Sequence, residues 1–158
     1  MRLFVAVWPP ADVVRLLSSL PRPHRQELRW TTEDQWHVTL RFLGEADPDA
    51  VAAELGPALA GRGARDVVLG PVTRRLGASI LMAPVSGLDD LAAALPWPAD
   101  EPFTGHLTLA RAKRRSSVPR GLEGTPVSAG WRVDSVSLVR STLAPGGAVY
   151  DDVAAFPL

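Results

Sequence analysis

The chain of 158 residues contains no cysteine. Disulfide bonds, thiolate catalysis and cysteine-based metal centres are therefore excluded. No apolar stretch approaches the roughly 18 residues that span a membrane. The first ten residues also lack the basic start, the apolar stretch and the small-residue cleavage site of a signal peptide. We therefore expect a protein that binds no membrane and works in the cytoplasm.

Net charge is absent too, because 17 Lys and Arg residues balance 17 Asp and Glu residues. A strongly basic domain concentrates nucleic acid through its overall field, and this chain does not. If the partner is RNA, we expect recognition to be local, at an end or at a single phosphate. The length and the 46% share of hydrophobic residues are typical of one folded domain over residues 1–158.

Short helices and strands are predicted between the many prolines and glycines. Apolar residues at helical spacing predict a helix over 11–20. Asp47 and Pro48 are typical of a helix start and predict a second helix over 48–59. A third is predicted over 87–95, with Ser86 as its cap. Strands are predicted at 2–8, 28–31, 36–43, 66–69, 76–85, 103–110, 131–139 and 148–156. This order predicts an α+β fold, with helices packed against antiparallel sheets.

One four-residue pattern occurs twice. His37-Val38-Thr39-Leu40 and His106-Leu107-Thr108-Leu109 each lie in a predicted strand. In both, histidine and threonine share one face of the strand and the aliphatic residues share the other. Either motif alone is weak support for a function, but two of the chain's three histidines belong to this pattern. An internal duplication would turn both polar faces toward one cleft.

These residue types suit the hydrolysis of a phosphodiester. Histidine serves as general base or general acid near neutral pH, so two of them can act on either side of a phosphorus atom. The hydroxyls of Thr39 and Thr108 can donate to the nonbridging oxygens and offset charge in the transition state. The scheme needs no metal and no cofactor, and the sequence lacks the close histidine pair typical of zinc sites. The residues alone do not decide which histidine is the acid.

Five segments resemble the 2H phosphoesterase superfamily and, within it, the RNA 2′,3′-cyclic phosphodiesterases, which are also called 2′-5′ RNA ligases. They follow one another along nearly the whole chain, at residues 2–7, 36–44, 103–111, 136–141 and 147–150. The second and third contain the two motifs with their flanks. The resemblance implies two pseudo-symmetric lobes, each an antiparallel sheet backed by helices, with the active site in the central cleft.

The resemblance also implies an activity, the hydrolysis of a terminal 2′,3′-cyclic phosphate on RNA to a 2′-phosphate. It makes His37 the proton donor to the departing 3′ oxygen and His106 the acceptor that activates water. It makes Thr39 and Thr108 the phosphate-binding residues. The expected partners are RNA 3′ ends or short oligoribonucleotides with a cyclic phosphate, and we expect a monomer. Three alternatives stay open: a non-catalytic binder of nucleotides or RNA ends, a 2′-5′ RNA ligase that runs the same site in reverse, and a 2H enzyme for another substrate, such as a small cyclic nucleotide derivative.

Two positions fit the resemblance less closely. Arg111 matches an arginine that is common after the second motif, and it is a candidate phosphate ligand. Strict alternation, however, places it on the face opposite His106, so it reaches the phosphate only if the strand ends or bulges near Ala110. Gly105 stands where many relatives have proline. We expect this glycine to loosen the entry to the strand without removing any chemical group.

Alternation also sorts the other candidate side chains. It places Arg41 on the cleft face, near the outer part of a substrate, and it places Trp36 and Phe42 on the core face. Phe4, in a continuous apolar strand, is predicted to belong to the core. His24 lies between prolines and is predicted to be a surface residue.

Overall fold

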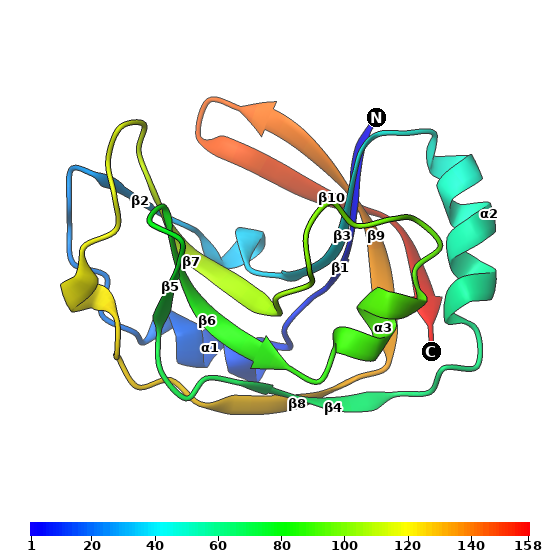
Figure 1. Cartoon of the computed structure of the whole chain (residues 1–158), viewed down its shortest axis with the longest axis horizontal. Coiled ribbons are helices and arrows are strands. Elements are labelled where there is room, and N and C mark those ends of the chain that lie inside the picture. The colour runs from blue at the N-terminus through cyan, green and yellow to red at the C-terminus, as the bar shows by residue number, and fades with distance from the viewer.

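The computed structural model describes all residues from Met1 to Leu158. Its centre is a curled, antiparallel sheet of ten strands in which the main path runs β10-β9-β1-β3-β7-β6-β4-β8 (Figure 1). Strand β2 adds to β7 and strand β5 adds to β6. The strands are β1 (Arg2–Val7), β2 (Leu28–Trp30), β3 (Val38–Glu45), β4 (Arg65–Leu69), β5 (Arg74–Leu76), β6 (Ile80–Ser86), β7 (His106–Ala112), β8 (Ala129–Val133), β9 (Ser135–Ala144) and β10 (Gly147–Pro157). The helices are α1 (Ala11–Ser18), α2 (Pro48–Leu59) and α3 (Asp89–Ala94), with short 3-10 turns at Glu33–Gln35 and Arg120–Leu122.

Two lobes meet where β3 pairs with β7, and this seam has one register pair, Val38 with Leu107. The first lobe contains β10, β9, β1 and β3, and α2 packs against β10. The second lobe contains β7, β6, β4 and β8 with β2 and β5, and α1 packs against β8. Helix α3 contacts both α2 and β3. The expected α+β fold with two sheet lobes backed by helices is confirmed.

Hydrophobic packing occurs on both faces of β1. Leu3 and Val5 point into the large core that extends under both lobes, whereas Phe4 and Ala6 form a small second cluster with Val139 of β9. Burial of each large side chain contributes on the order of 1.5–3 kcal/mol. The centre of the first lobe is therefore firmly packed on the face that carries the active-site side chains as well as on the core face.

The helix starts agree only in part with the sequence. Asp47 caps α2, since its carboxylate accepts the backbone N–H of Ala50 at 3.3 Å, and Pro48 takes the first helical position as predicted. Ser86 does not cap α3. Its hydroxyl donates instead to the carbonyl of Val68 on the neighbouring strand β4, at 3.4 Å. The sheet therefore holds Ser86, and α3 begins only at Asp89.

Two segments predicted as single strands are pairs of strands. Residues 76–85 contain the turn of the β5–β6 hairpin, where Gly77 has a φ of +60°. Residues 131–139 divide at Asp134 into β8 and β9, which belong to different lobes. At the second break the apolar positions change parity, from Trp131 and Val133 to Val136 and Leu138, and the single predicted strand passed over this change.

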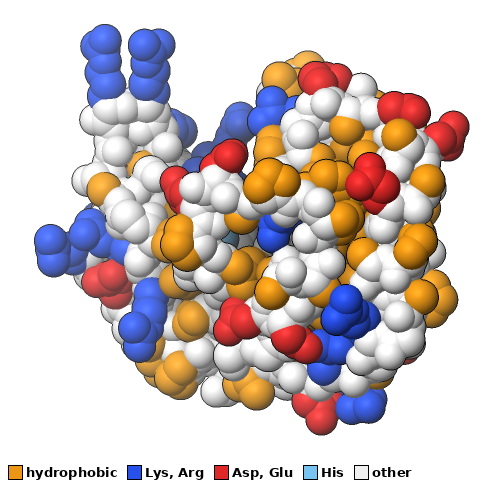
Figure 2. Space-filling view, turned by 45° about the vertical axis from the view of Figure 1, so that its right-hand side comes forward, with side chains coloured by type: hydrophobic (Ala, Val, Ile, Leu, Met, Phe, Trp, Pro, Cys, Tyr) orange, Lys and Arg blue, Asp and Glu red, His pale blue; other side chains and the backbone are white.

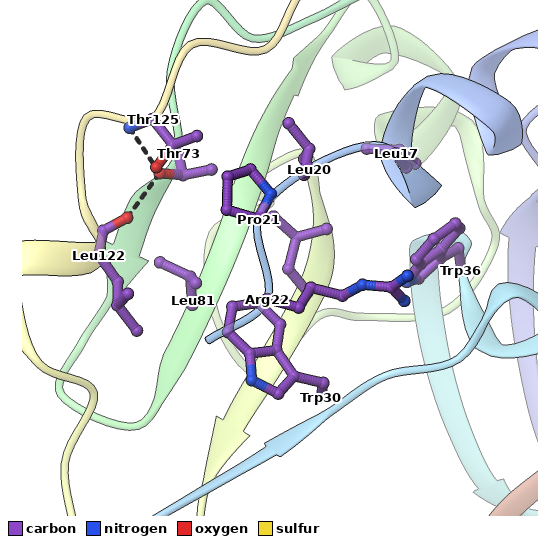
Figure 3. Close-up of a pocket in the computed structure, with 11 residues that line it drawn as sticks. Leu17, Leu20, Pro21, Arg22, Trp30, Trp36, Thr73, Leu81, Leu122 and Thr125 are labelled. Carbon is purple, nitrogen blue, oxygen red and sulfur yellow. Dashed lines mark hydrogen bonds between the residues drawn. The ribbon is translucent and has the colours of Figure 1, made fainter. Parts of the chain in front are cut away.

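A narrow pocket lies on the core side of the sheet (Figure 3). Leu17, Trp30, Trp36 and other apolar side chains form most of its wall. At one end the hydroxyl of Thr73 donates to the carbonyl of Leu122 at 2.8 Å and accepts the N–H of Thr125 at 3.1 Å. Its cavity volume of about 20 Å³ is room for about one water molecule. This pocket is a packing gap, on the face opposite the two motifs.

None of the helices is both long and apolar enough to cross a membrane.

Candidate active site

The register between β3 and β7 brings the two motifs together. Val38 is paired with Leu107 in antiparallel sense. In such a ladder the neighbouring positions are also opposed, so His37 lies across from Thr108, and Thr39 lies across from His106. The surface hollows agree, because one contains His37 with Thr108 and another contains Thr39 with His106. The four predicted side chains therefore share one face at the seam of the lobes.

Both imidazole rings are held in the same way. The Nδ1 atom of His37 lies 2.7 Å from the carbonyl oxygen of Gln35, and Nδ1 of His106 lies 2.7 Å from that of Thr104. A carbonyl oxygen only accepts, so each Nδ1 carries a proton and donates it. Each Nε2 is therefore the atom available for proton transfer. In His37 this atom lies 2.9 Å from the hydroxyl of Thr39, which can donate to it.

Aromatic rings enclose His37. The centroids of Phe4, Tyr150 and Trp8 lie 4.9, 5.1 and 5.7 Å from that of the imidazole. Burial lowers the pKa of His37 from 6.5 to about 4, against the hydrogen bond to Gln35, which raises it. The charges of Arg111 and His106 lower it further. In the free protein His37 is therefore neutral at pH 7, and charges of the second lobe act directly on the first.

A β-bulge brings Arg111 to this face. Along the β6–β7 ladder, Leu81 pairs with Ala110 and Met82 pairs with Thr108, so Leu109 is the extra residue. The extra residue resets the alternation of β7. Arg111 consequently lines the same hollows as His37. The condition that the sequence set for this residue, a bulge near Ala110, is met.

The first motif has a bulge at the equivalent position. Ala6 pairs with Thr39 and Val5 pairs with Arg41, so Leu40 is the extra residue in β3. Phe42, opposite Phe4, therefore faces the cleft, where its ring is 54% exposed. Arg41 is paired with the core residue Val5, and its guanidinium donates to the carbonyls of Trp97 and Ala92. It nevertheless lines the hollow that contains Thr39 and His106, as predicted, whereas the predicted face of Phe42 was wrong, because alternation stops at a bulge.

The hydroxyl of Thr31 braces the bulge of β7. It lies 2.8 and 2.9 Å from the carbonyl oxygens of Thr108 and Leu109, to which it donates. It also accepts the indole N–H of Trp36 at 2.9 Å, and the backbone N–H of Thr31 donates to Leu109 at 2.9 Å. These contacts hold the irregular backbone between Thr108 and Arg111. Sequence reasoning missed Thr31, since nothing in the pattern announced the bulge.

Gly105 is held tightly, contrary to expectation. Its carbonyl accepts the N–H of Val85 at 2.9 Å. A Cβ atom at this position would lie 2.0 Å from the carbonyl oxygen of Val85, so a side chain would force the strands apart. The glycine therefore permits a close backbone approach directly before His106, and the strand entry is not loose.

The remaining candidates lie mostly where the sequence placed them. Trp36 is buried in the large core at 1% exposure, and His24 is exposed on a loop. Phe4 is buried as predicted, but it lies under His37 in the smaller cluster. No three His, Asp or Glu side chains are placed to share a metal ion. Around the cleft, Figure 2 shows basic side chains lying in a recess between raised parts of the surface.

Comparisons with known proteins identify the family of the chain and its fold. The family model described as LigT like phosphoesterase matches residues 7–67, which contain the first motif. An RNA 2′,3′-cyclic phosphodiesterase of Thermus thermophilus is 32% identical, and the match covers 100% of this chain and 90% of that protein. The crystal structure of TT0787, also of Thermus thermophilus, matches with a TM-score of 0.76 and 29% identity, over 100% of this chain and 98% of that one. The crystal structure of E. coli LigT complexed with 3′-AMP has the same fold, with a TM-score of 0.77, 23% identity and coverage of 99% and 97%.

The fold and the paired histidine motifs define a phosphoesterase of the 2H superfamily. Within that class, the chain belongs to the LigT-like phosphoesterase family. The family resemblance drawn from the five sequence segments is confirmed.

Proposed function

We propose that this enzyme opens a terminal 2′,3′-cyclic phosphate on RNA and leaves a 2′-phosphomonoester. The observation that carries the proposal is the β3–β7 register, which sets each histidine opposite the threonine of the other motif. Such a pair can act on both sides of one phosphorus atom. The activity named for the Thermus thermophilus relative supports this substrate class.

In the proposed reaction the phosphate lies between the two Nε2 atoms, with Thr39, Thr108 and Arg111 donating to its nonbridging oxygens. His106 takes a proton from water, whose oxygen forms the new bond to phosphorus. The bond from phosphorus to the 3′ oxygen breaks, and His37 gives that oxygen its proton. No metal takes part, and one copy of the chain supplies every group, so we propose a monomeric enzyme.

The role of proton donor requires that His37 carry a proton when the substrate is bound. A residue with a pKa of about 4 carries no proton to donate at pH 7 in the free protein. The anionic phosphate stabilises the imidazolium and offsets the nearby charge of Arg111. We therefore propose that substrate binding protonates His37. The opposite assignment, with His37 as the base, would need no such change, and the pH dependence of single-histidine variants distinguishes the two.

Phe42 gives the proposed substrate a place for its base. Its ring is parallel to that of Phe4, with centroids 6.4 Å apart and an interplanar angle of 4°, and the guanidinium of Arg2 lies 5.0 Å from the centroid of Phe42. Leu143, 85% exposed, lines the same hollow. Aromatic rings stack on nucleobases with little regard for sequence. We propose that Phe42 and Leu143 hold the terminal base while the motifs hold the phosphate.

The test is incubation with an oligoribonucleotide that ends in a 2′,3′-cyclic phosphate, followed by product analysis. A 2′-phosphate is the expected product. A 3′-phosphate would overturn the assignment of the leaving oxygen, joined strands would identify a ligase, and binding without any product would identify a non-catalytic module. Activity should survive excess chelator. Loss that an added metal restores would refute the metal-free reaction.

A further inference from the structure

A second positively charged hollow lies beside His37, between the β2–β7 edge and the start of β10. It is separate from the hollow that contains Phe42, but both contain His37, Arg111, Ala148 and Tyr150. No carboxylate lines it. Its residues are Arg29, Thr31, Gln35, His37, Thr108, Arg111, Gly147, Ala148 and Tyr150.

Arg29 and Arg111 form the charged wall of this hollow. They are direct cross-strand neighbours in the β2–β7 ladder, so their side chains leave the sheet on the same face. Neither guanidinium forms an ion pair or a hydrogen bond within the protein. Two like charges directly opposed across antiparallel strands destabilise the pair. An anion between them would remove this repulsion and give both guanidinium groups an acceptor.

The backbone of the β9–β10 turn leaves room for Arg29. At Gly147, which has a φ of +117°, a Cβ atom would lie 3.4 Å from Nη1 of Arg29 and 3.4 Å from Nε2 of Gln35. Gln35 in turn donates through Nε2 to the carbonyl of Ala148 at 2.9 Å. The guanidinium of Arg29 thus reaches from β2 across to the start of β10. It forms the wall of the hollow next to Gly147.

We propose that Arg29 binds a second phosphate, the one on the 5′ oxygen of the terminal nucleotide, while Arg111 lies between the two phosphates and donates to both. This rests on the proposed function, since the cyclic phosphate must occupy the two motifs. With the base against Phe42 and the cyclic phosphate at the histidines, the ribose lies between the two hollows. The phosphate on the 5′ oxygen of this nucleotide then lies in the hollow that contains Arg29. The preferred substrate class is accordingly an RNA end whose last nucleotide carries a 5′ phosphate, rather than a cyclic mononucleotide alone.

The experiment compares kcat/KM for three substrates: a nucleoside 2′,3′-cyclic phosphate, the same nucleotide with an added 5′-phosphate, and a dinucleotide with the cyclic phosphate at its end. A charge-assisted contact predicts a preference on the order of tenfold for the two substrates with a second phosphate, carried mainly by KM. A dinucleotide with a neutral methylphosphonate linkage should lose that preference. If only the dinucleotides gain, with either linkage, the second nucleoside is recognised and the proposal is wrong.

The variant Arg29→Met should bring the preference ratio to about one. Arg25→Met is the matched control, because Arg25 is also an exposed arginine and does not line the hollow. It should keep the wild-type ratio. A preference ratio near one in the wild type, or an equal loss of kcat/KM for all three substrates in Arg29→Met, overturns the proposal about Arg29. The proposed function still holds in that case if the cyclic mononucleotide is hydrolysed. If none of the three substrates is hydrolysed, the proposed function itself is refuted.

Discussion

The two halves of the site share a backbone geometry and differ in their surroundings. In each half, Nδ1 of the histidine donates to a carbonyl at 2.7 Å, and a bulge follows the motif threonine. His37 is enclosed by aromatic rings and its Nε2 is bonded to Thr39, whereas Nε2 of His106 makes no hydrogen bond within the protein. A repeated scaffold therefore presents two imidazoles with different environments, which is how a pair of like groups is separated into an acid and a base.

The bulges extend the comparison beyond the histidines. The fifth residue after each histidine turns toward the cleft, and it is Phe42 in one half and Arg111 in the other. The first half thereby gains a stacking surface and the second gains a positive charge. The two halves therefore expose the same position after the histidine, but they carry different types of side chain there.

The largest effect should come from removing either imidazole. His37→Ala and His106→Ala should each lower kcat/KM by on the order of 10²- to 10⁴-fold, because each removes one proton-transfer group. Rates measured from pH 4 to pH 10 should show which limb of the profile each variant loses. If His37 is the donor, His37→Ala loses the limb that falls at high pH. A variant that keeps nearly full activity would remove that histidine from the mechanism.

The burial of His37 should also make the stability of the protein depend on pH. Below pH 6.5 the unfolded chain takes up a proton at His37, whereas the folded protein does so only near pH 4. The unfolded state therefore binds more protons in this window, and the free energy of unfolding should fall as the pH drops, by on the order of 2–3 kcal/mol. Urea titrations at pH 7 and pH 4.5 measure the fall.

His37→Gln should remove most of this contribution to the pH dependence. His24→Gln, which replaces an exposed loop histidine, should retain it. An equal fall in His37→Gln and the wild type would show that other groups cause the acid sensitivity.

Substitution of either motif threonine should lower activity less than substitution of a histidine, and it should also distinguish the two halves. Thr39→Val and Thr108→Val each remove a proposed phosphate donor and should cost about 2 kcal/mol of transition-state stabilisation, on the order of 30-fold in kcat/KM. Only Thr39 also bonds the imidazole of its own motif. Thr39→Val should therefore shift the pH–rate profile as well, whereas Thr108→Val should lower the rate without moving it. Identical profiles would mean that the Thr39 contact to His37 does not tune its protonation.

The smallest effect should come from the brace under the second bulge. Thr31→Val removes the hydroxyl that bonds the carbonyls of Thr108 and Leu109, and should lower kcat/KM about fivefold, about 1 kcal/mol. Thr73→Val is the control, because Thr73 is a buried threonine whose hydroxyl bonds the backbone carbonyl of Leu122 and no atom of either motif. Both variants should lose similar stability in urea titrations. Equal losses of activity would make the Thr31 effect a general one on the fold.

How far the sequence reached can be seen at the motifs themselves. The faces of His37, Thr39, His106 and Thr108 followed from alternation, because each bulge begins only after the motif threonine. Phe42 was assigned to the wrong face, and Arg111 could be placed only on a condition, because an extra residue in a strand leaves no mark in an apolar pattern. The close approach at Gly105 depends on the carbonyl of Val85, a partner that no local signal identifies.

The same limit applies to the fold. The start of α2 at Asp47 and Pro48 was predicted correctly, since capping depends on neighbouring residues. The division at Asp134 was missed although the apolar positions change parity there, because a change of parity does not reveal that the two strands join different lobes. Strand pairing involves residues that are far apart in the chain, and a single sequence contains little information about it.

The chain order of the two lobes has a consequence for synthesis on the ribosome. Strands β4 to β8 follow one another from residue 65 to residue 133, whereas β1 pairs early with β3 and receives its second neighbour, β9, only near the end of the chain. The wall around His37 combines Phe4 and Trp8 with Tyr150. A growing chain can thus complete most of the His106 lobe first and the His37 pocket last. A polypeptide cut after Val133 would lack Tyr150 and with it this wall of the His37 pocket.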